Sequence, residues 1–381
     1  MKTLIELYDE RPAENVLSVE AFKPETVVYL CPGGVAQDKN VQKRIVSFLK
    51  KRGLETKAVF LETSLFNTEK VKRQMERVRS EYPDCALDIT GGTDAALFAG
   101  GLFCAEKELP AFTFSWKKKM FYNIYKADFA EGLKCPVKYG IEDFFVMAGG
   151  EMKQGRVDNG LLSEYSGIIE PFFEIFMKNR RNWKKFIGYM QKVSQPHGKL
   201  RVEAPCSVKL ERGVSVTADR VILAELEKIG MIKNLRFEEN SSLSFDFRDE
   251  LCRSWLRDVG AVLEVMTWKY CVDSEKFNEV KTSCVVVWED GAVQDAVMNE
   301  LDVVAVEGVT PTFISCKTCA IDTDALNELA ILRRRFGGDA ARSVIVSTEK
   351  CRAITRHRAE SLGIEVVDID NIKALYHPFK H

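Results

Sequence analysis

Apolar strands and amphipathic helices alternate through the first third of the chain, and no other feature of the sequence limits the fold as much. Short apolar runs of the buried-strand type stand at 2–7, 26–31, 57–62, 85–90 and 111–116. The segments between them, near 12–20, 38–52, 67–81 and 93–108, have helical periodicity. Strands joined through helices by short connections form a parallel, doubly wound sheet, which binds ligands beyond the carboxyl ends of its strands. The predicted fold class is therefore α/β, with a Rossmann-like parallel-sheet domain at the N-terminus.

The rest of the 381 residues is long enough for one or two further domains. Two helices are predicted at 161–177 and 179–193, followed by a helix, a glycine turn and two strands. This pattern indicates a small winged-helix-like unit, and an α/β insertion between two lobes is an equal alternative. A helix, three strands, a helix, a strand, a helix and a strand follow. The predicted domains are 1–140, a linking region at 141–247 and a C-terminal α/β domain at 248–381.

The composition excludes several classes of protein. An apolar fraction of 46% is ample for packed cores, and no apolar run approaches the roughly 20 residues that span a bilayer. The 11 cysteines show no framework spacing, which is typical of reduced thiols in a cytosolic protein. The isolated pair Cys316 and Cys319 lacks the further ligands that a zinc site needs. We therefore expect a cytoplasmic protein without a membrane-spanning segment.

The net charge of −1 conceals three basic clusters, at 178–201, 333–335 and 350–358. The first contains eight Lys or Arg and no acid, with aromatic residues between them. Such patches suit contact with a phosphate backbone, although a solvated helix face would look the same. The residues predicted to contact nucleic acid are Arg180, Arg181, Lys184 and Lys185.

The segment DITGGT, residues 88–93, leads from a strand into a helix and is the first candidate site. Gly91 and Gly92 allow a sharp turn and a close approach of the backbone to a ligand. Thr93 can cap the helix, whose first N–H groups favour an anion, and Thr90 offers a second hydroxyl. The spacing matches neither a P-loop nor a dinucleotide fingerprint. Without further evidence, the turn could equally be one that only starts a helix.

Other loops at the same edge of the sheet favour a polyanionic ligand. Asp9, Glu10 and Arg11 follow the first strand, and a lysine cluster that includes Lys117 follows the fifth. With the DITGGT turn, this domain resembles the CRISPR-associated Rossmann-fold (CARF) sensor domain, whose members dimerise and bind a cyclic oligoadenylate. The resemblance implies ligand contacts from Thr90, Gly91, Gly92 and Thr93, and from the loop of Asp9, Glu10 and Arg11.

The second candidate site lies on two apolar strands in the last third of the chain. If the strands pair, Asp302 in NELDVVAV can approach Lys317 in FISCKT. An aspartate in such a strand is costly to bury without a cation or hydrogen bonds, and Mg²⁺ or Mn²⁺ would satisfy it. The alternative is a buried Asp302–Lys317 salt bridge within a structural sheet.

The sequence segments around these residues, GAVLE, NELDVVAV and FISCKT, resemble those of the PD-(D/E)xK restriction-endonuclease-like fold. They are most similar to the version joined to a CARF domain in type III CRISPR ancillary nucleases. The resemblance implies that Glu264 and Asp302 hold the metal with the carbonyl of Cys316, and that Lys317 is the catalytic lysine. Ser315 stands in the catalytic position where the family pattern has an acid, so the site loses one formal charge.

These resemblances predict an allosterically activated, metal-dependent endonuclease of type III CRISPR defence that cuts DNA or RNA without sequence specificity. Mn²⁺ or Mg²⁺ is the expected cofactor, cyclic tetra-adenylate the first choice of activator, and a homodimer the expected assembly. The alternative is a cyclic-oligoadenylate-sensing, nucleic-acid-binding regulator whose nuclease fold is inactive. A sensor that hydrolyses its own ligand is a third possibility.

Overall fold

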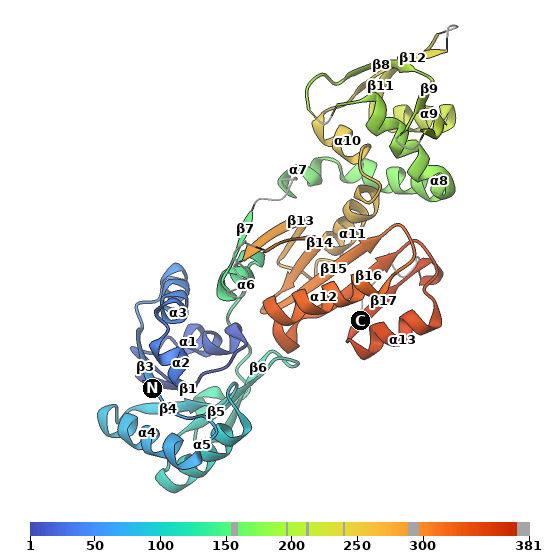
Figure 1. The fold of residues 1–381 in the computed structure, drawn as a ribbon. Coiled ribbons are helices and arrows are strands. Elements are labelled where there is room, and N and C mark those ends of the chain that lie inside the picture. Colours follow the sequence, from blue (N-terminus) through green and yellow to red (C-terminus); the bar gives the residue numbers. More distant parts are fainter. Residues whose placement is uncertain (154–158, 196, 211–212, 239–240, 289–296, 372–381) are drawn as a thin grey trace.

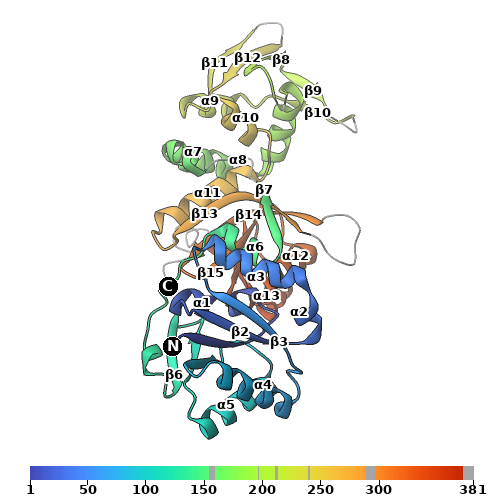
Figure 2. The same ribbon diagram turned by 90° about the vertical axis from the view of Figure 1, so that its left-hand side faces the viewer.

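The structure is a computed structural model that describes residues 1–153, 159–195, 197–210, 213–238, 241–288 and 297–371. Figures 1 and 2 show three parts in a row, with the C-terminal domain between the N-terminal domain and the middle region. The middle region was expected to link the other two domains. It links them in sequence only, because in space it lies at the far end of the molecule.

The N-terminal domain, all of whose residues are described, is built on a six-stranded sheet in the order β3-β2-β1-β4-β5-β6. All neighbouring strands are parallel except β5 and β6. The strands are β1 (Thr3–Leu7), β2 (Thr26–Cys31), β3 (Lys57–Glu62), β4 (Cys85–Asp88), β5 (Ala111–Ser115) and β6 (Met120–Tyr125). Every residue of β1, β2 and β4 is buried, which explains their nearly continuous apolar sequences. The strand order reverses between β1 and β4, where sheets of this kind bind ligands.

Helices cover both faces of this sheet. Apolar residues of α1 (Leu17–Phe22) and α3 (Lys39–Lys51) pack on one face, and those of α4 (Thr68–Glu81) and α5 (Asp94–Lys107) on the other. Side chains cap three of these helices, since Asp38, Asn67 and Thr93 accept hydrogen bonds from the first backbone N–H groups. The short elements η1 (Pro12–Asn15), α2 (Gly33–Gln37) and η2 (Asp128–Ala130) complete the domain.

The described strands of the C-terminal domain form a six-stranded sheet in the order β17-β16-β15-β14-β13-β7. They are β7 (Gly150–Lys153), β13 (Glu279–Trp288), β14 (Val297–Glu307), β15 (Thr310–Lys317), β16 (Arg342–Ser347) and β17 (Ile364–Val367). α11 (Ala261–Asp273) packs on one face and α12 (Thr323–Phe336) on the other. The remaining elements are η4 (Gly338–Ala340), α13 (Ala353–Ser361) and η5 (Ile369–Asn371). From residue 248 onward the predicted order of helices and strands is confirmed with one exception: the single helix expected before the three strands is two helices, α10 (Glu250–Trp255) and α11.

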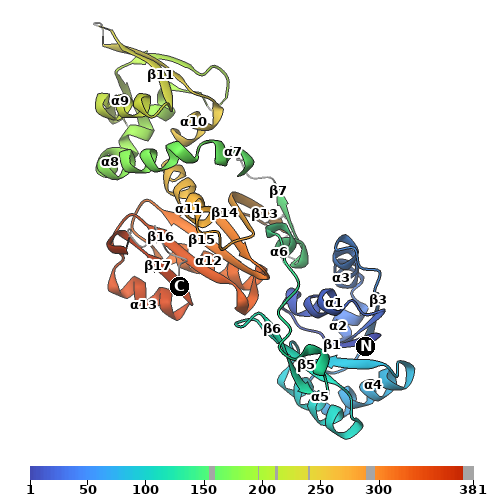
Figure 3. The same ribbon diagram turned by 180° about the vertical axis from the view of Figure 1, so that it is seen from behind.

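One part of the expected linker belongs to the C-terminal sheet. α6 (Ile141–Met147) packs beside α12, and β7 pairs with β13 and so forms one edge of the sheet (Figure 3). The sequence of β7, GEMK, is short and polar, so it carries no strand signal of its own. The prediction that the whole of 141–247 is a separate region is therefore wrong at its N-terminal end.

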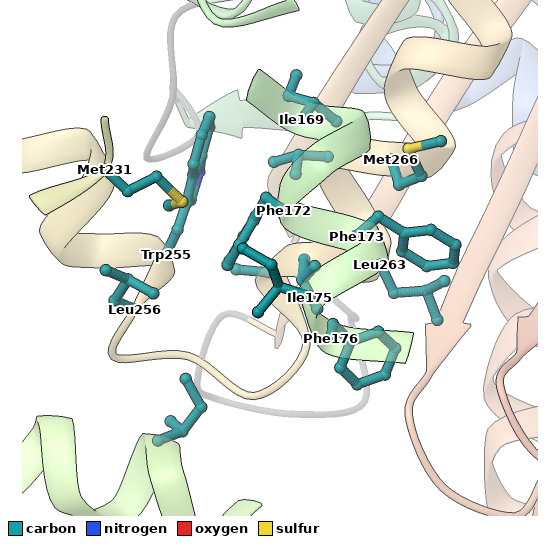
Figure 4. Close-up of a cluster of buried hydrophobic side chains, with 14 of the residues drawn as sticks. Ile169, Phe172, Phe173, Ile175, Phe176, Met231, Trp255, Leu256, Leu263 and Met266 are labelled. Atoms are coloured by element: carbon teal, nitrogen blue, oxygen red, sulfur yellow. The ribbon is translucent and has the colours of Figure 1, made fainter. Parts of the chain in front are cut away.

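The middle region combines one long helix with small sheets. α8 (Ser166–Val193) is a single helix of 28 residues that includes Pro171, whereas two helices were predicted. Its apolar residues recur every three or four positions and pack between α10 and α11 (Figure 4). The other elements are α7 (Asn159–Glu164), β8 (Arg201–Pro205), β9 (Ser207–Lys209), β10 (Ser215–Thr217), α9 (Arg220–Lys228), β11 (Ile232–Phe237), β12 (Ser242–Phe247) and α10 (Glu250–Trp255).

The helix α9 followed by antiparallel β11 and β12 has the predicted winged-helix-like order, with β8 as a third strand. None of the described helices is both long enough and apolar enough to cross a membrane. The architecture as a whole confirms the predicted α/β class.

Candidate functional site

The pairing of the C-terminal sheet is interrupted at the second candidate site. β13 and β14 pair along their length except at the facing residues Ser283 and Asp302. On the other side, pairing between β14 and β15 ends at Val303 and Ile314. The side chains also change face here, because Leu301 packs in the core on the α12 side and Val303 in the core on the α11 side. A regular strand would put these two residues on the same face, so the backbone of β14 is irregular at Asp302.

The carboxylate of Asp302 replaces the missing strand pairing. Its Oδ2 atom accepts a hydrogen bond of 2.6 Å from the backbone N–H of Cys316 and one of 3.2 Å from the hydroxyl of Ser315. Burial nevertheless keeps the pKa of Asp302 above its ordinary value, although these hydrogen bonds and the charge of Lys317 act to lower it. The carboxylate is thus held in place, but the positive charge around it is too small to offset the cost of burying its negative charge.

Glu264, in the first turn of α11, approaches the same point from the face of the sheet. Burial, and after it the negative charges of Asp302, Asp258 and Glu300, raise the pKa of Glu264 to about 8. Glu300 itself is exposed. A buried carboxylate whose pKa is raised by burial and by a neighbouring carboxylate is the arrangement that a divalent cation would stabilise.

Ser283 supports Glu264 from the other strand of the interruption. It is buried and has a positive φ of 48°, a conformation that costs a residue with a side chain roughly 1 kcal/mol or more. Its hydroxyl lies 3.4 Å from Oε2 of Glu264, at the long limit for a hydrogen bond. Sequence reasoning missed Ser283, because a serine within TSCVVVW carries no signal that the strand is irregular.

Lys317 ends β15 and is half-buried. Among the described residues, no ion pair within 4.0 Å joins it to Asp302, so the structure does not support the alternative of a buried salt bridge. Its backbone carbonyl accepts a hydrogen bond of 3.2 Å from Thr348, in the loop that follows β16. Within the described part of the chain, no ion pair or hydrogen bond occupies its ammonium group.

The donor set at this site fits a hard divalent cation. Within the described part of the chain, no three His, Cys, Asp or Glu side chains are grouped to hold a metal. The two carboxylates that come together here are those of Glu264 and Asp302, so a cation would need a backbone carbonyl and water to complete its ligands. The thiol of Cys316 is buried against Thr267, with a pKa well above its ordinary value, so this residue could contribute only its carbonyl. Cys319 is exposed, and the paired cysteines do not form a zinc site in the described structure.

The first candidate site borders a cavity of about 1690 Å³. Five predicted ligand residues line it: Asp9, Glu10, Arg11, Gly92 and Thr93. The opposite wall belongs to the C-terminal domain and comprises Ala330, Ile331, Arg333, Arg334, Arg335, Gly338 and Leu362. The cavity therefore lies between two domains, and we call it the interdomain cavity.

The glycine turn is fixed by contacts within the protein. Gly92 has a φ of +111°, and a Cβ atom there would lie 2.8 Å from Cβ of Leu7. Its N–H donates to Oδ2 of Asp9 at 2.9 Å, and Arg11 donates to both oxygens of the same carboxylate. Although burial acts to raise the pKa of Asp9, these hydrogen bonds hold it below its ordinary value. Asp9 and Arg11 thus brace the turn from the first loop.

Three of the predicted ligand residues do not line the cavity. The hydroxyl of Thr90 accepts the N–H of Phe114 at 2.8 Å and so joins β4 to β5. Gly91 packs against Asp9 and Glu14. Lys117 is exposed on the β5–β6 turn, outside the described lining. Conversely, Arg44 and Lys70 line the cavity, and sequence reasoning missed them because lysines and arginines on amphipathic helices are common.

The basic and the aromatic residues of α8 differ in their exposure to solvent. Arg181, Lys184 and Lys185 are exposed, whereas the aromatic residues between them, Trp183, Phe186 and Tyr189, are buried in the core. Arg180 donates to the carbonyl of Thr348 at 2.7 Å, which ties α8 to the loop beside Lys317. Phosphate contact by this face remains a prediction, without aromatic stacking on bases.

Comparison with known proteins identifies the C-terminal domain. Residues 253–379 match the family model described as Card1-like, endonuclease domain. No curated protein matches the chain. Among solved structures, protein VC1899 from Vibrio cholerae is similar with a TM-score of 0.73 and 17% identity, covering 98% of this chain and 96% of that one.

Two further similar structures are of proteins linked to cyclic oligoadenylates. Can2 from Sulfobacillus thermosulfidooxidans, solved in complex with cyclic tetra-adenylate, has a TM-score of 0.71 and 15% identity, covering 99% of this chain and 95% of that one. A type III CRISPR defence DNA nuclease activated by cyclic oligoadenylate has a TM-score of 0.51 and 15% identity. The similarity covers 98% of this chain and 51% of that one, so this chain spans about half the length of that protein. Residues 253–379 thus match a Card1-like endonuclease domain, and the fold of the whole chain is similar to that of Can2, which confirms the predicted resemblance.

Proposed function

We propose that this chain is a cyclic-oligoadenylate-activated, metal-dependent nuclease of type III CRISPR defence that acts in the cytoplasm on DNA, RNA or both. One observation carries the proposal. Within the matched endonuclease domain, Glu264 and Asp302 converge at an interrupted strand beside Lys317. Two of the similar structures, one solved with cyclic tetra-adenylate and one a nuclease activated by cyclic oligoadenylate, support the same function.

Glu264, Asp302 and the carbonyl of Cys316 would hold Mn²⁺ or Mg²⁺. When bound, such a cation lowers the pKa of a water molecule and stabilises charge on a phosphate. The residues of the chain do the rest. The N–H of Cys316 and the hydroxyl of Ser315 orient the carboxylate of Asp302, and Lys317 offers its positive charge to the scissile phosphate. Without base-reading contacts, cleavage would not depend on sequence.

The interdomain cavity is the proposed activator site. Its volume of about 1690 Å³ exceeds that of an ordinary small-molecule pocket, as a cyclic oligonucleotide requires. Asp9 and Arg11 brace the loop at the switch point of the N-terminal sheet, and Arg44 and Lys70 supply positive charge. A ligand between two domains can change their relative orientation, which is the proposed route of activation.

We further propose a homodimer joined through the N-terminal domains. Phe66, Phe98 and Leu102 are 82%, 64% and 41% exposed, a costly arrangement for large apolar side chains that a second copy would cover. Phe66 also lines the cavity, so the apolar surface continues into the activator site. A pair of related copies would match the symmetry of a cyclic ligand.

The alternative function is a ligand-controlled regulator that binds nucleic acid without cutting it. Two observations favour it: the exposed basic face of α8 beside a winged-helix-like unit, and the serine at position 315. One experiment separates the two functions. The purified chain is incubated with DNA or RNA, Mn²⁺ or Mg²⁺, and cyclic tetra-adenylate or hexa-adenylate. Cleavage that Lys317→Ala abolishes supports the nuclease, and ligand-dependent binding of intact nucleic acid supports the regulator.

A further inference from the structure

The interdomain cavity contains more positive charge than the N-terminal domain alone contributes. Its described lining has six basic residues and three acidic ones. The basic residues are Arg11, Arg44, Lys70, Arg333, Arg334 and Arg335, and the acidic ones are Asp9, Glu10 and Glu62. Half of the cations come from the last turn of α12, in the endonuclease domain. A polyanion in this cavity would therefore meet positive charge from both sides.

The three arginines of α12 differ in what they already contact. Arg335 stacks over the ring of Trp288, with its guanidinium 5.0 Å from the ring centre. Arg333 donates to the carbonyl of Gly363 at 3.0 Å and so fastens the helix to the start of β17. Arg334 is exposed, and the described residues offer it no hydrogen bond or ion pair. Of these three arginines, Arg334 is therefore the one whose guanidinium N–H groups are available to donate to a phosphate.

The end of α12 also lies against the loop that braces the glycine turn. Gly338, two residues after the helix, has a φ of +59°, and a Cβ atom there would lie 3.5 Å from Cγ of Arg11. Arg11 in turn holds Asp9, which accepts the N–H of Gly92. The loop that braces the glycine turn and the end of α12 are therefore in contact across the domain boundary.

α12 connects this wall to the strands of the proposed metal site. Leu329, Leu332 and Phe336 on its inner face pack in one core with Phe313 of β15 and Ile345 of β16. β15 carries Lys317 at its end, paired with Ser347 of β16. A shift at the end of α12 would therefore move side chains that pack against the strand that ends at Lys317.

We propose that the end of α12 is the second half of the activator site, and that Arg334 binds a phosphate of the same ligand that the N-terminal loops bind. The ligand is a polyanion with several phosphates, as in a cyclic oligoadenylate. The endonuclease domain then senses the activator directly, because the ligand draws α12 toward the N-terminal domain. This inference rests on the proposed function, which supplies the ligand class.

The test compares charge-reversed variants of the full chain by titration calorimetry with cyclic tetra-adenylate and cyclic hexa-adenylate. Arg334→Glu should weaken binding about tenfold or more, as the loss of a charge-assisted hydrogen bond to phosphate implies. Lys43→Glu is the matched control. Lys43 is equally exposed and lies beside Arg44 on α3, but it does not line the cavity, so binding should change less than twofold.

A second measurement locates the contact independently of the substitution. In wild-type protein, the ligand should slow amide hydrogen exchange at residues 330–338 as well as in the loops after β1 and β4. Protection confined to the N-terminal loops, or Arg334→Glu binding within twofold of wild type, would overturn the inference and leave the proposed function standing. Failure of the wild-type chain to bind either ligand would overturn both.

Discussion

Ser283 and Asp302 face each other across the single interruption in the described β13–β14 pairing. One has a left-handed backbone and approaches Glu264, and the other accepts the N–H of Cys316. The irregular pairing is thus what turns two buried strands into a site. Without it, Asp302 would continue the alternation of a structural sheet.

Asp302 holds the N–H of Cys316, and the proposed function gives it a second, separable role in binding metal. Asp302→Asn keeps an oxygen that can accept the N–H of Cys316 but loses the negative charge. We expect cleavage to be abolished while the free energy of unfolding changes by less than about 1 kcal/mol. Asp302→Ala leaves that N–H unsatisfied and should cost about 1–3 kcal/mol more. Urea unfolding together with a cleavage assay measures both, and equal stability of the two variants would contradict the hydrogen-bonding role.

Ser315 tests how much acid the metal site needs. Ser315→Asp would place a third carboxylate beside Asp302, whose Oδ2 is 3.2 Å from the present hydroxyl. Binding of Mn²⁺ should become tighter by at least several-fold, while the metal-free protein loses about 1 kcal/mol from repulsion between the two acids. Ser315→Ala should change cleavage only a few-fold, because the N–H of Cys316 still orients Asp302. The measurement is calorimetric titration of Mn²⁺ into wild type, Ser315→Asp and Ser315→Ala. An unchanged affinity of Ser315→Asp for Mn²⁺ would place position 315 outside the proposed metal site.

Ser283 offers a matched pair of substitutions. Ser283→Gly and Ser283→Ala both remove the hydroxyl near Glu264, but glycine tolerates the φ of 48° that alanine does not. We expect both variants to lose cleavage to a similar extent, with the glycine variant about 1–2 kcal/mol more stable than the alanine variant. If the more stable glycine variant kept its cleavage activity and only the alanine variant lost it, Ser283 would have a structural role only.

Glu14 gives the N-terminal domain a pH dependence of stability. Its carboxylate lies 3.4 Å from Arg11, but burial outweighs that charge and raises the pKa of Glu14 to about 7. Since the folded pKa lies above the ordinary value, the neutral form is favoured on folding. The stabilisation is therefore complete below about pH 4.5 and disappears as the pH rises through about 7.

The measurement is urea unfolding between pH 4 and 8 in wild type and Glu14→Gln. Relative to the glutamine variant, wild-type protein should lose up to about 3 kcal/mol over this range, the equivalent of the pKa difference. Parallel pH profiles of the two proteins would show that Glu14 titrates normally in the folded state.

The sequence predicted those features that depend on local patterns. Buried strands such as β2 and β14, and the cap at Thr93, follow from residue type and periodicity alone. Asp302 and Lys317 could be found because charged residues on apolar strands are rare. The continuity of α8 was missed, since the basic run that begins at residue 178 invites a break that the packing of its apolar face overrides.

Features that depend on distant contacts could not be predicted. β7 becomes a strand only because β13 offers an unpaired edge. The cluster at Arg333–Arg335 was interpreted as a general basic patch, whereas the structure brings it to the cavity of another domain. The unfavourable backbone of Ser283 leaves no trace in its own sequence, because the surrounding sheet imposes it.

The central claim is that one chain joins an activator site to a metal-dependent endonuclease site. The most direct test is the initial rate of cleavage of DNA and RNA oligonucleotides with Mn²⁺, with and without cyclic tetra-adenylate or cyclic hexa-adenylate, in wild type and Asp302→Asn. The account predicts that one of these activators raises the wild-type rate at least tenfold and that Asp302→Asn stays inactive in its presence. A wild-type rate that neither activator changes, or an Asp302→Asn variant that is still activated, would contradict it.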